Sequence, residues 1–369
     1  MQPTNFYRPT FAQVDLNSIK MNILNLKKHI SHSVDIIAVV KANAYGHGDL
    51  EVSKAAVEAG ASMLAVATPD EAIRLRASGI ESPILVLGAS PSSFAPVASE
   101  QNITLTVFQR EWFLHIPTLP QTLKVHIKID TGMGRLGVTT ESELGSLIQM
   151  IHDRQDVEID GVFTHFATAD EQDDVQFTNQ LEKFNTFLQQ FKERPRCIHT
   201  ANSAASLMYQ DSLFDAVRFG ISMYGLSPSE YVNSGLPFPL KPAMTLQTEV
   251  VHVKKVQAGS PISYGATYIA AEDEWIATLP IGYADGMLRK LNGQEVLIQG
   301  KRMPIVGRIC MDQCMVRLDG QVPIGEPVKL IGRQGNEQVT IEEWAQKLET
   351  ISYEVPCVLT NRVPRIYTS

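Results

Sequence analysis

A lysine in an unusual setting is the first candidate for chemistry in this sequence. Lys41 follows the apolar run VDIIAVV and precedes ANAYGHG, a stretch with a tyrosine, two glycines and a histidine. A lysine is almost never fully buried unless its charge is compensated, and becoming a neutral amine removes that cost. Burial and neighbouring cations favour the neutral form by lowering the pKa of a lysine from about 10.4. Lys41 is therefore a candidate either for a charge contact or for a Schiff base with a carbonyl group.

Other polar residues stand where apolar runs end and could act with this lysine. The run KID leads into TGMGR and Arg135, and FTH ends in His165. HTANS ends in Asn202 and Ser203. Arg218 stands just before FGISMYG, whose glycines let backbone N–H groups approach an anion closely. A phosphate site beside a reactive lysine is the combination that pyridoxal phosphate requires, so we expect this cofactor.

The elements that would position these residues alternate in a regular order. After a first helix at 15–30, apolar runs of strand length are separated by stretches of helical period such as 69–79 and 172–193. Eight such β/α repeats in about 200 residues favour a TIM barrel over an open doubly wound sheet. Active sites of TIM barrels lie at the C-terminal ends of the strands, where Lys41 and the other candidates stand. The eight predicted strands are 35–41, 62–68, 83–88, 103–108, 123–130, 158–165, 197–202 and 215–220.

The sequence changes character after the proline-rich stretch PFPLKPAM. Short strand-like runs separated by glycines follow, and they predict a mostly β domain. Thr340, with Glu343 three residues later, predicts one helix there through a capping box. We therefore expect a barrel domain over residues 1–241 and a mostly β domain over 242–369. The segment up to about residue 12 is expected to pair with the second domain.

Composition limits the partners of the chain. Of its 369 residues, 44% are hydrophobic and 20% are charged, which is ordinary for a globular protein, and the formal net charge is -8. The negative charge argues against nucleic acid or an anionic membrane as the main partner and favours a small-molecule ligand. The sequence shows neither a signal peptide nor an apolar run of the ~18 residues that a membrane span needs, so we expect a cytoplasmic protein. The spacing of the four cysteines does not predict a zinc site, and we expect no metal.

Sequence blocks along the chain resemble those of one enzyme family. VVKANAYGHG is similar to the pyridoxal-phosphate lysine motif of the alanine racemases, a fold-type III family. A single block would be weak evidence, but nine blocks occur in the family's order between about Asp15 and the end of the chain. The resemblance implies an eight-stranded α/β barrel followed by a β domain. The other blocks are KIDTGMGRLG, THFATAD, HTANSAA, VRFGISMYG, SYGATY, PIGYADG, GRICMDQ and EVPCVLTNRVPR.

The resemblance implies two bases for the reaction. Lys41 would bind pyridoxal phosphate covalently and act as one base, and Tyr264 in SYGATY would act as the other from a partner subunit. Racemisation needs both, because a proton leaves one face of a planar intermediate and another arrives on the opposite face. A homodimer with shared active sites would thus be part of the chemistry. From the sequence alone, Tyr264 is an ordinary core or surface tyrosine.

The resemblance also implies roles for the cationic residues of the barrel. Arg218 would hydrogen-bond the pyridine nitrogen of the cofactor and, being always charged, would disfavour its protonation. His165 would contact Arg218, although a lone histidine in FTHFA is otherwise a core residue. Arg135 would bind the substrate carboxylate through its fork of donors. Lys128 matches a lysine that many family members carry as a carbamate, and an unmodified Lys128 is the alternative.

The remaining implied contacts fall into two groups. The first would bind the cofactor, largely at its phosphate, through hydroxyl and backbone N–H groups: Tyr45, Asn202, Ser203, Gly220, Ile221 and Tyr353. The second would line the entrance near the substrate methyl group, where Met311 and its neighbours would come from the partner subunit. Its members are Tyr283, Cys310, Met311 and Asp312. The second group could equally consist of ordinary residues of a dimer interface.

The function favoured by these observations is interconversion of L-alanine and D-alanine, with D-alanine feeding peptidoglycan synthesis in a bacterium. The nearest alternative is a broader amino-acid racemase, which would differ in pocket volume around Tyr353 and Met311. A barrel decarboxylase is disfavoured because it should place a carboxylate where this chain has Arg218. A non-catalytic pyridoxal-phosphate carrier would be a single barrel, and residues 242–369 with Tyr264 argue against it.

Overall fold

The strands predicted for the first part of the chain close into a parallel barrel. In the computed structural model, which describes residues 6–369, one compact unit comprises Asn17–Pro242 and the other comprises residues 6–16 and 243–369. The first, called the barrel unit, contains the closed eight-stranded barrel, and the second, called the sheet unit, is mostly β. The predicted fold class is therefore confirmed.

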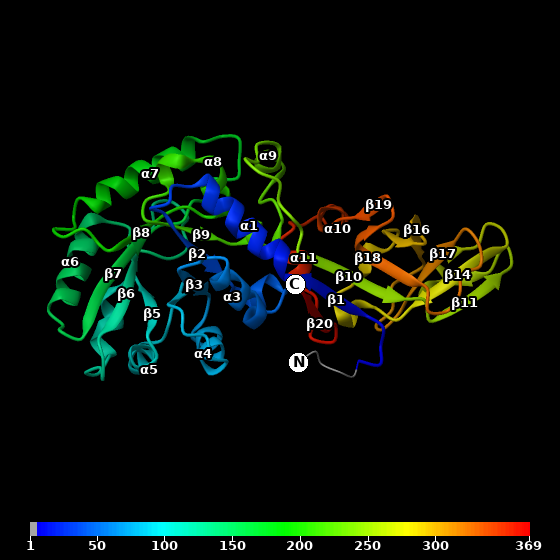
Figure 1. Cartoon of the computed structure of the whole chain (residues 1–369), viewed down its shortest axis with the longest axis horizontal. Coiled ribbons are helices and arrows are strands. Elements are labelled where there is room, and N and C mark those ends of the chain that lie inside the picture. The colour runs from blue at the N-terminus through cyan, green and yellow to red at the C-terminus, as the bar shows by residue number, and fades with distance from the viewer. Residues whose placement is uncertain (1–5) are drawn as a thin grey trace. The chain divides into compact units, whose positions relative to one another are not determined.

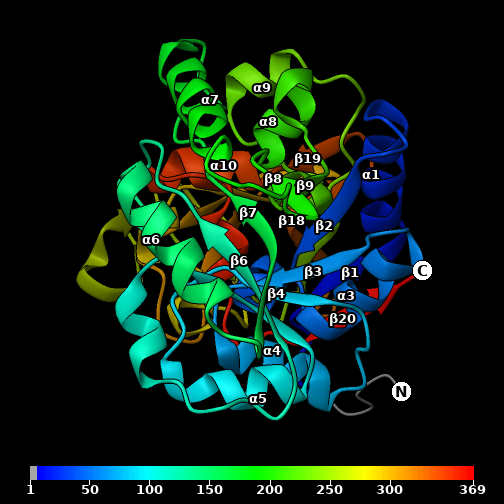
Figure 2. The ribbon, with the colours of Figure 1, turned by 90° about the vertical axis from the view of Figure 1, so that its left-hand side faces the viewer.

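Each barrel strand is hydrogen-bonded in parallel to two neighbours, and the eighth strand pairs with the first. The strands are rich in Ile, Leu and Val and are almost wholly buried, because a parallel sheet surrounded by helices is covered on both faces. Figure 2 shows helices arranged around these strands. The strands are β2 Asp35–Val39, β3 Met63–Val66, β4 Ile84–Val86, β5 Ile103–Val107, β6 Leu123–Lys128, β7 Val157–Phe163, β8 Cys197–His199 and β9 Ala216–Phe219.

The helices of this part of the chain follow the spacing of their apolar residues and the positions of their caps. The helices are α1 Leu16–His29, α2 Lys41–Tyr45, α3 Asp49–Glu58, α4 Pro69–Ala77, α5 Ala95–Glu100, α6 Glu141–His152, α7 Val175–Leu188, α8 Ser203–Met208 and α9 Glu230–Ser234. α7 buries Phe177, Phe184 and Phe187, whose spacing places them on one helical face. Thr68 is the N-cap of α4, and its side chain and that of Glu71 form a reciprocal capping box.

The sheet unit is built on a ten-stranded sheet. Its strand order is β11-β14-β17-β16-β15-β18-β10-β1-β20, and β19 pairs with β18 (Figure 1). β1 lies between β10 and β20, antiparallel to the first and parallel to the second. The strands are β1 Phe11–Asp15, β10 Met244–Glu249, β11 His252–Val256, β14 Glu274–Leu279, β15 Glu295–Ile298, β16 Lys301–Val306, β17 Cys314–Leu318, β18 Pro327–Gln334, β19 Glu337–Val339 and β20 Arg365–Thr368.

Smaller elements connect the strands of the sheet unit. They are β12 Pro261–Ile262, the 3-10 turn η5 Tyr264–Ala266, β13 Tyr268–Ile269, α10 Ile341–Leu348 and α11 Glu354–Cys357. Thr340 is the N-cap of α10 and exchanges hydrogen bonds with Glu343, so the predicted capping box is confirmed. No helix within residues 6–369 combines the length and the apolar character needed to cross a membrane.

Candidate active site

The candidate lysine begins a backbone turn of unusual hand. β2 ends at Val39, two residues earlier than predicted, and the half-buried Lys41 is the first residue of the short segment α2. Ala42, Asn43 and Ala44 follow with φ angles of 52°, 54° and 52°, in the left-handed region. This conformation costs about 1–2 kcal/mol for each residue other than glycine, so other contacts must hold the turn.

A carboxylate and an amide supply part of what holds this turn. Glu71 Oε1 accepts a hydrogen bond from the Ala42 N–H at 2.7 Å. Asn43 Oδ1 accepts one from the N–H of Asp49 at 3.1 Å, which ties the turn to the start of α3. Because the backbone is held on both sides, the direction in which Lys41 leaves the chain is fixed by the fold.

Groups from separate elements converge close to the end of β9. The Gly220 N–H donates to Ser203 Oγ at 2.9 Å, and a Cβ at position 220 would lie only 2.8 Å from Tyr45 Oη. Glycine is therefore required here by close approach. Ser222 Oγ is buried and has no hydrogen-bond partner within residues 6–369. Tyr45, Ser203 and Gly220 thus form a cradle, and Ser222 adds a buried hydroxyl two residues after Gly220. Hydroxyl donors of this kind suit a phosphate, so they fit the cofactor that the sequence implied.

Two further residues predicted at the cofactor have defined places beside the cradle. Asn202 is the N-cap of α8, and its Oδ1 accepts a hydrogen bond from the Ala205 N–H at 3.0 Å. Ile221 is buried and begins the 3-10 turn η4 (Ile221–Tyr224), directly after Gly220. Asn202 thus fixes the start of the helix that carries Ser203.

Arg218 is a buried cation surrounded by neutral acceptors. It is 4% exposed, and its Nη2 donates to the carbonyl oxygens of Thr164 at 2.8 Å and Thr200 at 2.7 Å. Its Nη1 lies 2.8 Å from His199 Nδ1, and its Nη2 lies 3.1 Å from His165 Nδ1. Burial lowers the pKa of Arg218 to about 9, which leaves the guanidinium charged at neutral pH. Many contacts therefore hold one permanent positive charge in a fixed orientation.

Positive charges crowd the mouth of the barrel. Burial lowers the pKa of His165 well below its ordinary value, and four cations lower it further. In order of decreasing effect these cations are Arg218, Lys128, Arg135 and Lys41. The structure therefore brings these four residues, all predicted from the sequence, within electrostatic reach of one imidazole.

Lys128 is held in an environment that favours its neutral form. Its Nζ donates to the carbonyl oxygen of Ile129 at 2.7 Å and lies 5.5 Å from the ring centre of Phe163. Burial and the charges of Arg218 and Arg135 lower the pKa of Lys128 to about 7, against an opposing effect of a nearby carboxylate. A large fraction of Lys128 is therefore an amine at neutral pH.

Arg135 lies exposed on the loop between β6 and α6. Asp130 Oδ1 organises this loop by accepting hydrogen bonds from the N–H groups of Gly132 at 3.0 Å and Gly134 at 3.1 Å. An open cleft of about 760 Å³ beside the loop is lined by Arg135 and by no other predicted site residue. The cleft is therefore distinct from the cradle.

Three large side chains predicted to lie at a subunit boundary are exposed in the sheet unit. The exposed fraction is 71% for Tyr264, 53% for Met311 and 39% for Tyr283. The Tyr283 N–H donates to the carbonyl oxygen of Cys310 at 3.0 Å, and Ser263 Oγ lies 3.5 Å from Cys310 Sγ. The segments that carry these side chains are therefore joined to one another through Cys310.

The other two predicted residues of the sheet unit have contacts and positions within it. Asp312 forms an ion pair with Arg362, with Oδ1 and Nη2 2.7 Å apart. Tyr353 is half-buried at the start of α11. Contacts of these residues with a cofactor or a second subunit remain predictions.

Sequence reasoning missed three residues that shape the site, namely Glu71, Ser222 and His199. His199 could have been suspected, because CIHTAN places a polar residue in a strand that the barrel must bury. Glu71 stands three residues after Thr68, which is a recognisable capping-box pattern. That pattern does not reveal the second partner of Glu71, the N–H of Ala42, because this contact arises only in the folded chain.

The chain matches two protein-family descriptions along most of its length. Residues 14–228 match "Alanine racemase, N-terminal domain", and residues 243–367 match "Alanine racemase, C-terminal domain". The alanine racemase of Geobacillus stearothermophilus is 52% identical over 366 residues, which cover 98% of this chain and 94% of that protein. Alanine racemase 1 of Bacillus subtilis is 50% identical over 369 residues, which cover 100% of this chain and 95% of that protein.

Solved structures are similar over the same extent. The crystal structure of alanine racemase from Bacillus anthracis with bound L-Ala-P has a TM-score of 0.96 at 48% identity, covering 99% of this chain and 96% of that chain. A histidine racemase from Leuconostoc mesenteroides has a TM-score of 0.92 at 30% identity, covering 99% of both chains. The fold is therefore shared by racemases of more than one amino acid.

Proposed function

Because the chain belongs to the alanine racemase family, and is therefore an amino-acid racemase and an isomerase, we propose how its own residues interconvert L-alanine and D-alanine. The observation that carries the proposal is the arrangement at the end of β9, where the buried Arg218 lies 3.1 Å from His165 Nδ1, two residues before the cradle at Gly220. Identities of 48–52% to alanine racemases support alanine as the substrate over the broader alternative. The histidine racemase, at 30%, is more distant.

Pyridoxal phosphate would be held by the amine of Lys41 and by the cradle around its phosphate. When bound, it supplies the electron withdrawal that makes the α-hydrogen of an amino acid acidic. The fixed turn after Lys41 would aim the amine, and the donors of the cradle would balance the charge of the phosphate. The residues proposed to hold the cofactor are Lys41, Tyr45, His165, Asn202, Ser203, Arg218, Gly220, Ile221 and Tyr353.

Lys41 and Tyr264 would move the proton on opposite faces of the substrate. The Lys41 amine holds or releases a proton on one face, and the hydroxyl of Tyr264 from the partner subunit does the same on the other face. The 71% exposure of Tyr264 in a single chain agrees with this role, because a side chain that reaches into another subunit lies on the surface of its own. The proposal therefore makes the homodimer the active form.

Arg218 would set the electronic character of the site. Its guanidinium is charged at neutral pH and already donates to carbonyl oxygens, so placed beside the pyridine nitrogen it would offer an N–H donor and no proton. A nitrogen that stays unprotonated withdraws fewer electrons than a protonated one. The site would thereby favour simple return of a proton over longer-lived side reactions.

Substrate binding would depend on Arg135, with Lys128 in support. Arg135 is exposed on its loop and can offer two parallel N–H groups to the carboxylate of alanine. A carbamate on Lys128 would turn a cation into an anion that orients Arg135, and the low pKa of Lys128 supplies the neutral amine that this adduct needs. Tyr283, Cys310, Met311 and Asp312 would close the entrance, with Met311 limiting the space beside the substrate methyl group. The bacterial relatives support a place for this activity in the cytoplasm, supplying D-alanine for peptidoglycan.

Incubation of the protein and pyridoxal phosphate with L-alanine in heavy water tests the proposal directly. We expect D-alanine that carries deuterium at the α-carbon, because the incoming proton comes from a base that exchanges with solvent. Chirality and deuterium content are measured on the same sample by chiral chromatography and mass spectrometry. Bound cofactor with neither inversion nor exchange would overturn the proposal and favour the carrier.

A further inference from the structure

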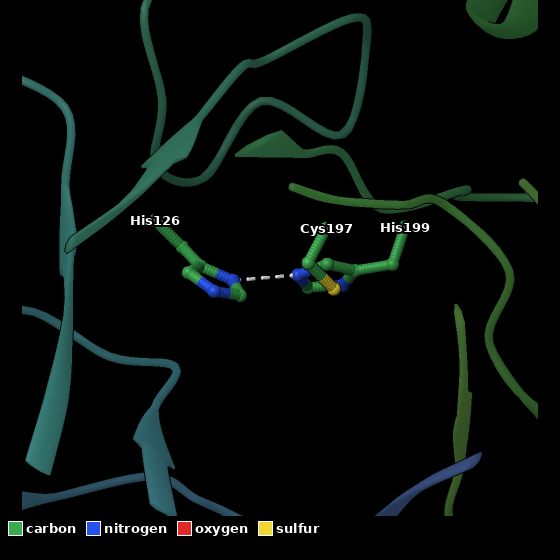
Figure 3. Close-up of side chains that lie close together, drawn as sticks. All are labelled: His126, Cys197 and His199. Carbon is green, nitrogen blue, oxygen red and sulfur yellow. Dashed lines mark hydrogen bonds between the residues drawn. The ribbon is translucent and has the colours of Figure 1, made fainter. Parts of the chain in front are cut away.

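A line of buried polar side chains runs from Arg218 into the interior of the barrel. Arg218 Nη1 lies 2.8 Å from His199 Nδ1, and His199 Nε2 lies 2.9 Å from His126 Nδ1. His126 Nε2 lies 3.4 Å from Asp160 Oδ2, and Asp160 Oδ1 lies 3.0 Å from Nε of Arg196, whose side chain is 72% exposed. Figure 3 shows the bond between the two imidazoles. This line of hydrogen-bonded side chains thus joins Arg218, the arginine proposed to contact the cofactor, to the surface at the start of β8.

A β-bulge places the carboxylate in this line. Between β6 and β7, Val125 pairs with Ile159 whereas His126 pairs with Gly161, so Asp160 is an extra residue in its strand. Bulges of this kind redirect a side chain. A Cβ at position 161 would lie 2.7 Å from His126 Nε2, so glycine is needed beside the ring. The local backbone is therefore arranged so that a buried carboxylate and an imidazole can meet.

The chemistry of the donors fixes the direction of every bond in the chain. Arginine can only donate, so His199 Nδ1 must be an unprotonated acceptor. His199 then carries its hydrogen on Nε2 and donates to His126 Nδ1. His126 in turn carries its hydrogen on Nε2 and donates to the Asp160 carboxylate. A proton added to either imidazole would place two hydrogens face to face in one of these bonds.

The surroundings of the chain favour these protonation states. Burial lowers the pKa of His126 and lowers the pKa of His199 well below its ordinary value, so both rings are neutral. The hydrogen bond from His126 lowers the pKa of Asp160, which keeps the carboxylate ionised. Within residues 6–369, none of the hydrogen-bond acceptors of Arg218 is a carboxylate. The negative charge of Asp160 therefore acts on Arg218 through the two polarised rings.

We propose that Asp160, His126 and His199 are positioning residues for Arg218, forming a hydrogen-bond chain of one polarity that keeps the guanidinium charged and correctly oriented. The consequence for the reaction rests on the proposed function of Arg218. The direction of the hydrogen bonds does not rest on that function, because it follows from the side chains of Arg218, His199, His126 and Asp160 themselves. A carboxylate that fixes the tautomer of a histidine is an established way to orient a reacting group.

A metal site is the competing interpretation of the same cluster. Ligand atoms of His126, Cys197 and His199 lie within 4.8 Å of one another, and Cys197 stands beside the rings in Figure 3. The direct bond between the imidazoles uses one nitrogen of each ring, and the other two nitrogens are bonded to Arg218 and Asp160. Burial raises the pKa of the Cys197 thiol to about 12, so the thiolate that a metal needs is disfavoured, and the charge of Arg218 would repel a cation.

Neutron diffraction from crystals of the holoenzyme grown near neutral pH tests the direction of the chain. We expect deuterium on Nε2 and none on Nδ1 in both His126 and His199, with an ionised Asp160. A doubly protonated ring, or a hydrogen on either Nδ1, would overturn the proposal. Density for an ion between His126, Cys197 and His199 would replace it with the metal site. This measurement needs no variant, so it does not depend on whether a mutant folds.

Kinetics of Asp160→Asn test the effect on the reaction. The amide can donate to His126 Nε2, which permits the reversed tautomers and turns a hydrogen of His199 toward Arg218. We expect kcat to fall about tenfold to a hundredfold, as for other residues that orient a reacting group, with a smaller change in KM for alanine. A merely structural role would lower thermal stability and leave kcat unchanged, which would overturn the proposal.

Cys197→Ala is the matched control because it removes a neighbour of both rings that is not in the chain. We expect the kcat of Cys197→Ala to equal that of the wild type. If the wild type contains a stoichiometric metal ion and Cys197→Ala does not, the competing metal site is favoured instead. If wild-type protein with bound cofactor racemises no amino acid, the proposed function fails, but the neutron result still decides the direction of the chain.

Discussion

At the scale of single residues, the barrel mouth combines permanent and removable positive charges. Arg218 and Arg135 keep their charge, whereas the pKa of Lys128 is lowered to about 7 and that amine can be neutral. The permanent charges attract anionic ligands and also favour loss of the proton from a neighbouring lysine. A cluster of this kind can bind a carboxylate while keeping an amine reactive.

Lys128 is predicted to react with carbon dioxide in a pH-dependent manner. Its pKa is lowered, so the amine that carbon dioxide requires predominates above about pH 7 and declines below it. We expect a 13C-carbamate NMR signal after equilibration with labelled bicarbonate at pH 8, and a weaker one at pH 6. The Lys128→Arg variant should lack the signal, whereas Lys124→Arg, on the same strand, should keep it. A wild-type sample without the signal at pH 8 would leave Lys128 unmodified.

The lowered pKa of Lys128 also makes the stability of the fold depend on pH. The folded protein bears the cost of burying charged Lys128 below about pH 7, where Lys128 is protonated in both the folded and unfolded states. The cost is relieved as the pH rises from about 7 toward 10.5, the ordinary pKa of a lysine, because only the unfolded state then carries the extra proton. Lys128 therefore contributes a stability that increases with pH in this window.

Replacing Tyr264 by phenylalanine should separate catalysis from cofactor binding. We expect Tyr264→Phe to keep the absorbance of bound pyridoxal phosphate and to lose racemisation by a factor of about 10² to 10⁴, because one base is missing. The matched control is Tyr268→Phe, four residues later, whose hydroxyl donates to Glu274 at 2.6 Å and has no proposed catalytic role. Normal turnover of Tyr264→Phe would contradict the two-base assignment.

At the scale of elements, the left-handed turn after Lys41 is a strained segment held by a helix cap. Glu71 belongs to the capping box of α4, and it also accepts the N–H groups of Ala42 and Ala67, each at 2.7 Å. One carboxylate therefore fixes the start of a helix and the backbone that follows Lys41. The turn and the helix should loosen together when this carboxylate is changed.

The substitution Glu71→Gln is predicted to weaken both the turn after Lys41 and the start of α4. An amide offers a single oxygen and turns its NH₂ group toward a backbone N–H, so we expect a loss of about 1–3 kcal/mol in the free energy of unfolding. We also expect weaker binding of pyridoxal phosphate, measured by absorbance titration of the apoprotein. Glu143→Gln is the control, because Glu143 closes the same kind of capping box on α6 away from this turn. Equal cofactor affinity in the two variants would show that Glu71 acts only as a cap.

Element order and type could be predicted from the sequence, whereas local register and hand could not. The eight strands follow from runs of apolar residues separated by helical periods, and the structure differs from the prediction at their ends: β2 ends at Val39, two residues early, and β8 ends at His199, three residues early. The left-handed angles of Ala42 and Asn43 could not be predicted, because neither position is a glycine. The bulge at Asp160 depends on pairing between strands, and the bond between His126 and His199 joins residues 73 positions apart. These features arise from contacts that no local pattern contains.

At the scale of the whole molecule, shared active sites are predicted to allow subunits to rescue one another. Lys41→Ala and Tyr264→Phe should each be inactive alone. After mixing, unfolding and refolding, about half of the dimers should be mixed and each should have one intact site, so we expect about a quarter of wild-type activity. Racemisation is measured in the mixture and in each variant treated in the same way. Absence of rescue, with dimers present by light scattering, would place both bases in one subunit.

The position of β1 in the sheet unit affects the order in which the protein is made. β1 leaves the ribosome before the barrel, but its two partners, β10 and β20, follow the barrel. At about 5–20 residues per second, β1 waits on the order of tens of seconds for β20, while the contiguous barrel can already close. A strand that waits unpaired is a risk for aggregation. β1 limits this risk through its five-residue length and its alternation of partly exposed and buried positions, which leaves little apolar surface open during synthesis.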